Sequence, residues 1–266
     1  MRLSLLLLLF FIALLLSLEG RDGKMEHVEN LSITIVYDNV AFNNFTASHG
    51  FACLLEVNGR RILFDTGGDG KILLSNMKKL GIEPSSISAV FLSHEHYDHV
   101  GGLASILQRN GNVTVYLLAS FPKELKDFVK AKGAKVVEVV GPLKLSNGVY
   151  STGGLGSMIK EQALVINTKR GAVVITGCAH PGIDNIVKFV VERFNKKIYL
   201  VVGGFHLMGQ SKEVVENVAK NLVELKVAKV MPCHCSGKLA VEIFSKLYGK
   251  NFETCGVGKV LKIKEV

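Results

Sequence analysis

The chain has 266 residues, of which 48% are hydrophobic, enough for one large core or for two half-domains. Its formal net charge is +9, which would suit an anionic small-molecule substrate, a nucleic acid or an acidic membrane surface. The lysines and arginines are scattered, however, and form neither an arginine-rich stripe nor a clear nucleic-acid-binding motif. Such a distribution is typical of a solvated surface, so we retain a small anionic substrate as the expected partner.

An apolar segment, Leu3 to Leu18, follows Arg2 and is shorter than the roughly 20 residues of a membrane-spanning helix. It resembles the core of a signal peptide, but no good cleavage site follows it. Residues 1–24 could be an uncleaved signal or anchor with membrane contact through residues 3–18, or a cleaved export signal. They could also be an extension, with translation starting at Met25 and a cytoplasmic location. Residues 25–266 form the expected globular domain.

The five cysteines are an odd number in a long chain, which argues against a disulfide framework and for reduced thiols. Cys233-His234-Cys235 has Cys-x-Cys spacing without a second pair, so a structural zinc site is not expected.

The first half of the domain alternates strand and helix patterns. We expect the following elements in chain order: a strand over Leu31–Tyr37, a hairpin of Phe51–Val57 and Arg61–Phe64, a helix over Lys71–Leu80, a strand over Ala89–Leu92, a helix from Gly101 to about Gln108, a strand over Val113–Leu118, a helix over Phe121–Ala131, and strands over Val136–Val140 and Gly148–Thr152.

The second half repeats this scheme. We expect a hairpin of Ala163–Asn167 and Ala172–Ile175, a helix over Ile183–Phe194, a strand over Lys197–Val202, a helix over Lys212–Leu225, a strand over Val227–Met231, a helix to Tyr248, and an edge strand over Lys259–Ile263. Both halves follow the order of hairpin, Thr-Gly turn, helix, strand and histidine-bearing loop. Two sheets packed face to face with helices outside would bring all these loops to one edge.

The segment Ser93–Gly102 concentrates potential metal ligands directly after a short apolar strand. His94 and His96 are two residues apart, so an extended backbone points both side chains the same way. Asp98 and His99 follow where the chain turns and can face a second point. Imidazole and carboxylate ligands suit zinc, iron or manganese, so the motif predicts two neighbouring divalent ions.

Six of the eight histidines occupy loops that follow predicted strands, and only His27 and His49 lie elsewhere. Because parallel strands end at the same edge of a sheet, these loops are expected to share one site. The six are His94, His96, His99, His180, His206 and His234.

These motifs resemble the metallo-β-lactamase superfamily. The resemblance rests on Leu63–Gly67 (Leu-Phe-Asp-Thr-Gly), on the His-x-His-x-Asp-His motif of His94–His99, and on the later single histidines. It implies an α/β fold, a four-layer αββα sandwich with two similar halves, and a centre of two divalent ions, zinc first. Thr176–Gly182, Gly203–Leu207 and His234–Gly237 further resemble the branch named for 7,8-dihydropterin-6-yl-methyl-4-(β-D-ribofuranosyl)aminobenzene-5′-phosphate synthase, also described as related to dihydropteroate synthase.

The resemblance also implies how the second half contributes. The usual histidine between the motif and the second Thr-Gly turn is missing, and His180 is expected to take its place. His234 would complete the second ion with Asp98 and His99. His206 would be either a ligand or an acid–base group facing the substrate.

Two further residues have open roles. Asp65 would orient a ligand histidine through its other ring nitrogen, or cap its own turn. Cys178 stands where a bridging aspartate is usual, and would be a thiolate ligand or a small buried residue.

The expected activity is that of a metal-dependent hydrolase, with a metal-bound hydroxide attacking an anionic ester-like or phosphate-bearing small molecule, with pterin-related compounds among the candidates. Asp98 would orient the hydroxide, and His206 would protonate the leaving group. One alternative is a transferase that joins a dihydropterin to an aminobenzene ribosyl phosphate. Another is a non-catalytic module that binds pterin and metal.

Overall fold

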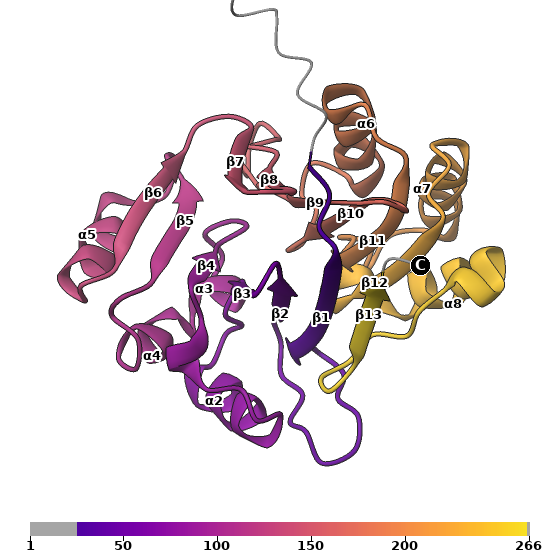
Figure 1. The fold of residues 1–266 in the computed structure, drawn as a ribbon. Helices are drawn as coiled ribbons and strands as arrows, with labels where there is room; N and C mark the ends of the chain where they lie inside the picture. Colours follow the sequence, from indigo (N-terminus) through magenta and orange to yellow (C-terminus); the bar gives the residue numbers. More distant parts are fainter. Residues whose placement is uncertain (1–25, 265–266) are drawn as a thin grey trace, which may run out of the picture.

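The computed structural model describes residues 26–264, so the expectations for residues 1–24 fall outside the part described. In this described part, thirteen strands form two sheets, and helices cover the outer face of each (Figure 1). Within residues 26–264, no helix is long and apolar enough to cross a membrane.

The first sheet has seven strands in the order β13-β1-β2-β3-β4-β5-β6. Its strands are β1 (Asn30–Tyr37), β2 (Ala52–Val57), β3 (Arg60–Phe64), β4 (Ala89–Phe91), β5 (Thr114–Leu118), β6 (Lys135–Val139) and β13 (Val260–Lys264). Strands β3 to β6 are parallel, whereas β13, β1 and β2 pair antiparallel. The carboxyl ends of β3 and β4 therefore lie at the same edge.

The second sheet has six strands in the order β12-β11-β10-β9-β8-β7. Its strands are β7 (Leu143–Ser146), β8 (Val149–Ser151), β9 (Leu164–Thr168), β10 (Gly171–Thr176), β11 (Ile198–Gly204) and β12 (Lys229–Cys233). Here β10, β11 and β12 are parallel, and β9 pairs antiparallel with β10. The arrangement β9-β10-β11 thus repeats that of β2-β3-β4, as the two predicted halves required.

Three apolar layers hold the sandwich together. One lies between the sheets and contains Ile33, Phe64, Ile166 and Val202, all of them fully buried. The second joins the first sheet to its helices, and the third joins the second sheet to the others. On the first sheet these helices are α2 (Gly70–Lys79), α4 (Leu103–Leu107) and α5 (Lys123–Ala131), and on the second they are α6 (Ile183–Phe194), α7 (Lys212–Glu224) and α8 (Gly237–Tyr248). Figure 1 shows the two helix groups on opposite sides of the molecule, which is the four-layer αββα order.

Local sequence signals set several helix ends. The carboxylate of Asp69 accepts hydrogen bonds from Lys71 N and Ile72 N, and so caps the start of α2. The hydroxyl of Ser211 accepts from Val214 N at the start of α7.

Three sequence expectations need correction. The helix expected from Gly101 to about Gln108 is shorter, because α4 covers only Leu103–Leu107, and a separate short helix, α3 (Tyr97–Val100), precedes it. Strand β7 was not anticipated. The expectation of reduced thiols is wrong for Cys233 and Cys255, which form a disulfide joining β12 to the segment before β13.

Candidate metal centre

The candidate ligands converge because each follows the carboxyl end of a parallel strand. Asp65 follows β3, the His94–His99 motif follows β4, and the second sheet brings three more loops to the same edge. Cys178 and His180 follow β10, His206 follows β11, and His234 and Cys235 follow β12. This is the edge at which α/β sheets place their ligands.

Two adjoining sets of donor atoms form there, and in each set the ligand atoms lie within 4.8 Å of one another. The first set is His94, His96 and His180; the second is Asp98, His99, Cys178 and His234. Asp98 Oδ2 lies 3.0 Å from His234 Nε2 and 3.5 Å from His99 Nε2. The structure thus places His180 beside His94 and His96, and His234 beside Asp98 and His99.

Hydrogen bonds of the first half fix which ring nitrogens can bind an ion. The buried carboxylate of Asp65 accepts from Ser93 N at 2.7 Å, from Ser93 Oγ at 2.7 Å and from His99 Nδ1 at 2.7 Å. A hydroxyl has one proton, and Ser93 donates it to Asp65, so His94 Nδ1 donates to Ser93 Oγ at 2.9 Å. Neutral His94 therefore carries its lone pair on Nε2.

The second half orients His234 in the same way. His234 Nδ1 lies 2.9 Å from Asn39 Oδ1, an oxygen that can only accept, so the ring donates through Nδ1. The backbone N–H of His234 donates to Asp38 Oδ1 at 2.8 Å. Burial raises the pKa of Asp38 to about 6, against the lowering effect of the backbone N–H groups of Val40 and His234.

The ring nitrogens that face the centre fit a bound cation. Within residues 26–264, the buried Nε2 atoms of His94, His180 and His234 have no hydrogen-bond partner, and the contact of His234 with Asp98 lacks hydrogen-bond geometry. Buried polar atoms are rarely left in this state, and an unprotonated imidazole nitrogen is the donor that zinc, iron and manganese accept. The residues present therefore fit divalent ions at both donor sets.

A second buried carboxylate shapes the loop after β10. Glu161 Oε1 accepts from the N–H groups of Gly177, Cys178 and Ala179 at 2.9–3.0 Å, and Oε2 accepts from His180 N at 2.9 Å. Burial raises the pKa of Glu161, and the backbone N–H groups of Ala179 and His180 oppose that shift. Four buried donors on one side chain hold the backbone that presents Cys178 and His180.

The charge balance of the centre favours neutral imidazole beside an ionised aspartate. Burial and the neighbouring histidines hold the pKa of His94 far below its usual range. Burial, with the charges of His206 and His96, lowers the pKa of His180 to about 4. Burial alone would raise the pKa of Asp98, but the close contact with His234 and the charges of His99 and His234 bring it well below its usual range. For His99, burial lowers the pKa, but the charge of Asp65, its hydrogen bond and the charge of Asp98 together outweigh burial and raise the pKa.

A third group, beside these two, consists of Cys178, His206 and Cys235. The contact with Cys178 lowers the pKa of Cys235 to about 4 and raises that of Cys178. His206 is exposed, and its hydrogen bond with Cys235 raises its pKa. Cys178 Sγ lies 3.2 Å from His99 Nε2, so this sulfur faces two of the groups.

Backbone strain is concentrated in the same loops. Asp65, Ala179, His206 and His234 have φ values of 53°, 61°, 53° and 47°, in the left-handed region that side chains with a Cβ rarely adopt. Such conformations persist where the surrounding structure enforces them, often at functional sites.

Sequence reasoning missed four residues of the centre. His49 was expected to lie elsewhere, but its exposed ring reaches Asp98 Oδ2 at 3.2 Å, and its ring centroid lies 4.9 Å from that of His234. Glu161, Asp38 and Asn39 carry no motif. The available signal was a charged or amide residue directly beside a strongly apolar strand, where burial without a partner is costly.

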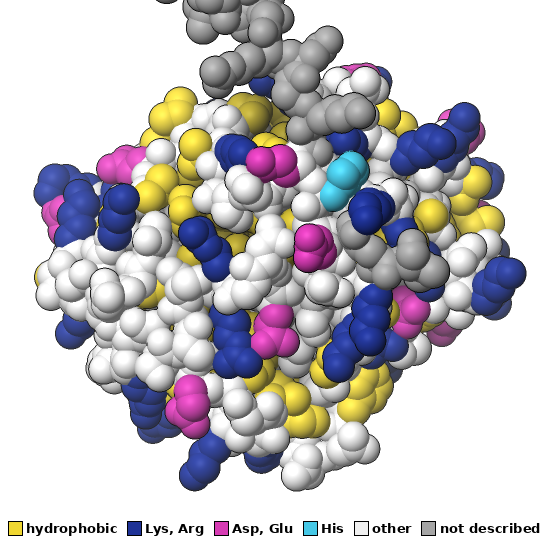
Figure 2. All heavy atoms as spheres, in the orientation of Figure 1, with side chains coloured by type: hydrophobic (Ala, Val, Ile, Leu, Met, Phe, Trp, Pro, Cys, Tyr) yellow, Lys and Arg dark blue, Asp and Glu magenta, His cyan; other side chains and the backbone are white. Residues whose placement is uncertain are grey.

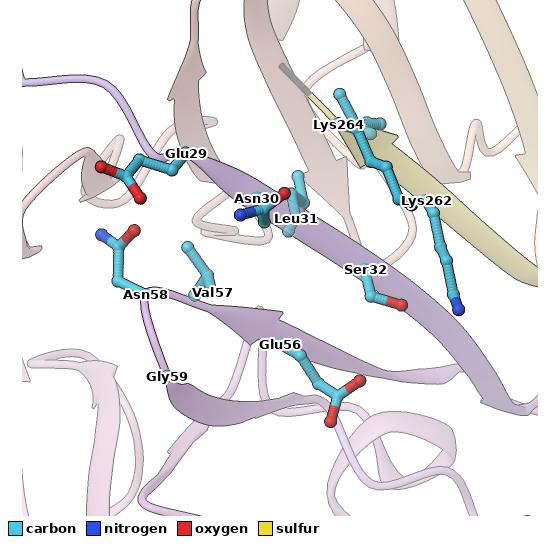
Figure 3. A pocket seen from close by; sticks show the side chains of 11 residues that line it. Glu29, Asn30, Leu31, Ser32, Glu56, Val57, Asn58, Gly59, Lys262 and Lys264 are labelled. Carbon is cyan, nitrogen blue, oxygen red and sulfur yellow. The ribbon is translucent and has the colours of Figure 1, made fainter. Parts of the chain in front are cut away.

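A cavity of about 570 Å³ lies beside His234. Its walls are mainly apolar, with Val40, Phe42 and Met208 among them, and its charged lining residues are Lys238, Asp38 and Glu242. A second cavity of about 390 Å³ (Figure 3) lies where β1 begins and β2 ends. Because β2 runs antiparallel to β3, this is the opposite end of the sheet from Asp65, and no histidine lines it.

The surface matches the scattered charge of the sequence. On the face drawn in Figure 2, lysine and arginine side chains are spread over the molecule and interspersed with acidic ones.

Comparisons with known proteins agree with this geometry. The model of the metallo-beta-lactamase superfamily matches residues 46–234. The chain is 31% identical to the 7,8-dihydropterin-6-methyl-4-(beta-D-ribofuranosyl)-aminobenzene-5′-phosphate synthase of Methanocaldococcus jannaschii, covering 88% of this chain and 97% of that one. An uncharacterized protein of the same organism is 30% identical, covering 87% and 100%.

Solved structures show the same fold. Tm1679, described as a metal-dependent hydrolase of the beta-lactamase superfamily, superposes with a TM-score of 0.76 at 32% identity, covering 88% of this chain and all of that one. The short form of human tRNase Z has a TM-score of 0.61 at 16% identity, over 86% and 98% of the two chains, and supports the fold alone. The matching family model, the αββα sandwich and these relatives together show that the chain belongs to the metallo-β-lactamase superfamily.

Proposed function

We propose that this enzyme is a metal-dependent hydrolase acting on an anionic, ester-like or phosphate-bearing small molecule, with pterin-related compounds as the first substrates to test. The observation that carries the proposal is the pair of adjoining donor sets, one entirely imidazole and the other containing the carboxylate of Asp98. The likeness to Tm1679, a protein described as a metal-dependent hydrolase, adds support.

Two divalent ions, zinc first, would be held by the two donor sets. His94, His96 and His180 would hold one, while Asp98, His99 and His234 would hold the other, with Cys178 beside them. When bound, such ions make water more acidic and polarise the oxygen of an ester or phosphate.

Asp98 is the proposed orienting group. Its side chain is 19% exposed, so one carboxylate oxygen can reach the substrate space while Oδ2 contacts the histidines. Its low pKa keeps it ionised at neutral pH, where a carboxylate only accepts hydrogen bonds. It would therefore accept a hydrogen bond from the attacking water and orient the water's lone pair toward the substrate.

His206 is the proposed proton donor. Its ring is exposed next to His180, with ring centroids 4.3 Å apart, and its pKa is raised by the contact with Cys235. A histidine that is partly protonated near neutral pH can give its proton to a leaving oxygen.

The cavity beside His234 would hold the rest of the substrate. Its volume of about 570 Å³ is in the range of small-molecule sites. Phe42 and Val40 offer apolar contact for a flat ring, and the ammonium group of Lys238 would attract an anionic substituent.

A synthase activity is the second candidate. The relative from M. jannaschii is named for a reaction product that contains a dihydropterin and an aminobenzene ribosyl phosphate, and the alignment spans nearly all of that protein. In such a reaction two substrates would be joined and no water would enter the product.

The experiment uses the metal-loaded protein in oxygen-18-labelled water. It is incubated with bis(4-nitrophenyl) phosphate, with a phosphorylated pterin, and with a dihydropterin plus an aminobenzene ribosyl phosphate, and the products are analysed by mass spectrometry. The label in a cleaved product supports the hydrolase. A joined, unlabelled product supports the synthase instead. Tight pterin binding without any turnover would contradict both and favour a binding module. His96→Ala is the control for activity that does not depend on the centre.

A further inference from the structure

The third donor group shares Cys178 with the second set but adds His206 and Cys235, and neither of the two ions proposed above needs these two residues. Its members come from three different loops, after β10, β11 and β12. Residues so far apart in sequence meet only because the fold brings these loops to one edge.

The group is compact and mostly buried. One ligand atom from each residue lies within 4.8 Å of the other two. The two cysteines are 4% and 6% exposed, whereas His206 is exposed, so the group opens to solvent on one side only. Cys235 Sγ also lies 3.5 Å from the backbone oxygen of Cys178, which keeps the two loops in contact.

The backbone around the group is shaped for this close approach. A Cβ at Gly204 would lie 2.6 Å from Cys235 Sγ and 2.4 Å from Gly177 O, so any larger residue would push the sulfur away. His206, two residues later, is held in the left-handed region at a φ of 53°. A strained histidine and an obligatory glycine in one short loop indicate that the position of this ring and sulfur is specified.

We propose that Cys178, His206 and Cys235 form a third cation site, selective for a thiophilic divalent ion such as zinc. Two sulfurs and one imidazole are a known donor set for zinc with one position left open. Sulfur ligands favour such ions over magnesium or calcium, and this separates the site from the imidazole and carboxylate sets beside it. Binding requires both sulfurs as thiolates, so a proton still held by either thiol is released to solvent.

The site shares a boundary with the neighbouring set. Cys178 Sγ faces His99 Nε2 at 3.2 Å, so an ion bound to Cys178 and Cys235 would lie next to the second donor set. It would also occupy the nitrogen of His206 that now contacts Cys235. Occupancy of the third site therefore gives His206 the role of ligand in place of proton donor. The site itself does not depend on which reaction the enzyme catalyses.

Cadmium is a suitable probe because its bonds to thiolate give an ultraviolet charge-transfer band. The full chain is dialysed against cadmium or zinc, the ions are counted by elemental analysis, and the band is recorded. Cys235→Ser should lose one ion per chain and, with it, most of the band, because the band comes from the ion that the two sulfurs hold together. Cys53→Ala is the matched control, since Cys53 is a buried free cysteine away from these loops, and it should change neither quantity.

His206→Ala gives a second test in which folding is not at risk, because the side chain is exposed. Even residues that only support a ligand are worth 10–100-fold in metal affinity, so affinity at this site should fall by at least about tenfold. His96→Ala should keep the band while losing activity, which separates this site from the proposed hydrolase. If Cys235→Ser binds as many cadmium ions as the unmodified chain and keeps the full band, the proposal is wrong.

Discussion

The two halves of the candidate centre each contain one fully buried carboxylate, but they use it differently. In the first half, Asp65 accepts from the side chains of Ser93 and His99 and from one backbone N–H. In the second half, Glu161 accepts only from backbone, from four successive N–H groups. The first carboxylate fixes the protons of imidazole rings, whereas the second fixes the path of a loop.

The difference follows from the residue that stands after each central strand. Asp65 directly follows β3, and Gly177 directly follows β10. A Cβ at Gly177 would lie 2.1 Å from Ser93 Oγ and 2.9 Å from Asp65 Oδ2, so the second loop packs against the first half's carboxylate and has no room for its own. A similar chain order in the two halves thus produces complementary structures at the edge where they meet.

Glu161→Ala should have the largest effect on stability. It leaves four buried N–H groups without an acceptor, and at about 1 kcal/mol or more for each we expect the free energy of unfolding to fall by about 4 kcal/mol. Urea unfolding followed by circular dichroism measures this. Glu161→Gln, which keeps one accepting oxygen, should lose about half as much. A loss below about 1 kcal/mol for Glu161→Ala would refute the role of Glu161 in holding the loop.

Asp65→Asn should have the second-largest effect on stability. It should act on the His99 ring, whereas Glu161→Ala acts on the loop after β10. The amide can still accept from Ser93 N, but its NH₂ faces His99 Nδ1, which then accepts and leaves the proton on Nε2. We expect a loss of about 2 kcal/mol in unfolding free energy and a 10–100-fold weaker binding of zinc. Zinc titration with a competing chelator measures the affinity. Unchanged affinity would show that Asp65 only caps its turn.

Much of the fold and of the ligand set could be predicted from the sequence. The Asp-Thr-Gly turn and the His94–His99 motif are local patterns, and their ligands and the orienting position of Asp65 could be proposed because the residues are close in the chain. The partners His180 and His234 could be proposed because each follows a predicted strand. The succession of strands and helices along the chain followed from periodic patterns, and the four layers followed from the resemblance to the metallo-β-lactamase superfamily.

Glu161, Asn39 and His49 could not be found in this way. Each contacts the centre from a different part of the chain, and no spacing relates Glu161 to Gly177 or Asn39 to His234 except the folded arrangement. The Cys233–Cys255 disulfide was missed for a related reason. The parity of the cysteine count carries no information about which two of them the fold brings together.

Ser93→Ala should have a smaller effect than either carboxylate change. The hydroxyl links Asp65 to His94 Nδ1, and its loss removes the acceptor for that ring proton. We expect the free energy of unfolding to fall by about 1 kcal/mol. Zinc affinity should weaken less than in Asp65→Asn, because His99 keeps its own contact with Asp65. A zinc affinity in Ser93→Ala lower than that of Asp65→Asn would mean that His94, and not His99, is the ring on which the first half depends.

His96→Ala should change the unfolding free energy of the metal-free protein least, by less than about 0.5 kcal/mol, because a half-exposed side chain away from both carboxylate networks is removed. Its effect on metal binding should be large, because the first donor set drops from three ligands to two. Elemental analysis after dialysis should show loss of one ion, with activity lost as well, while the circular dichroism spectrum is unchanged. Retention of both ions would remove His96 from the ligand set. Loss of folding would contradict the prediction in another way, because it would show that the fold itself depends on the His96 ring.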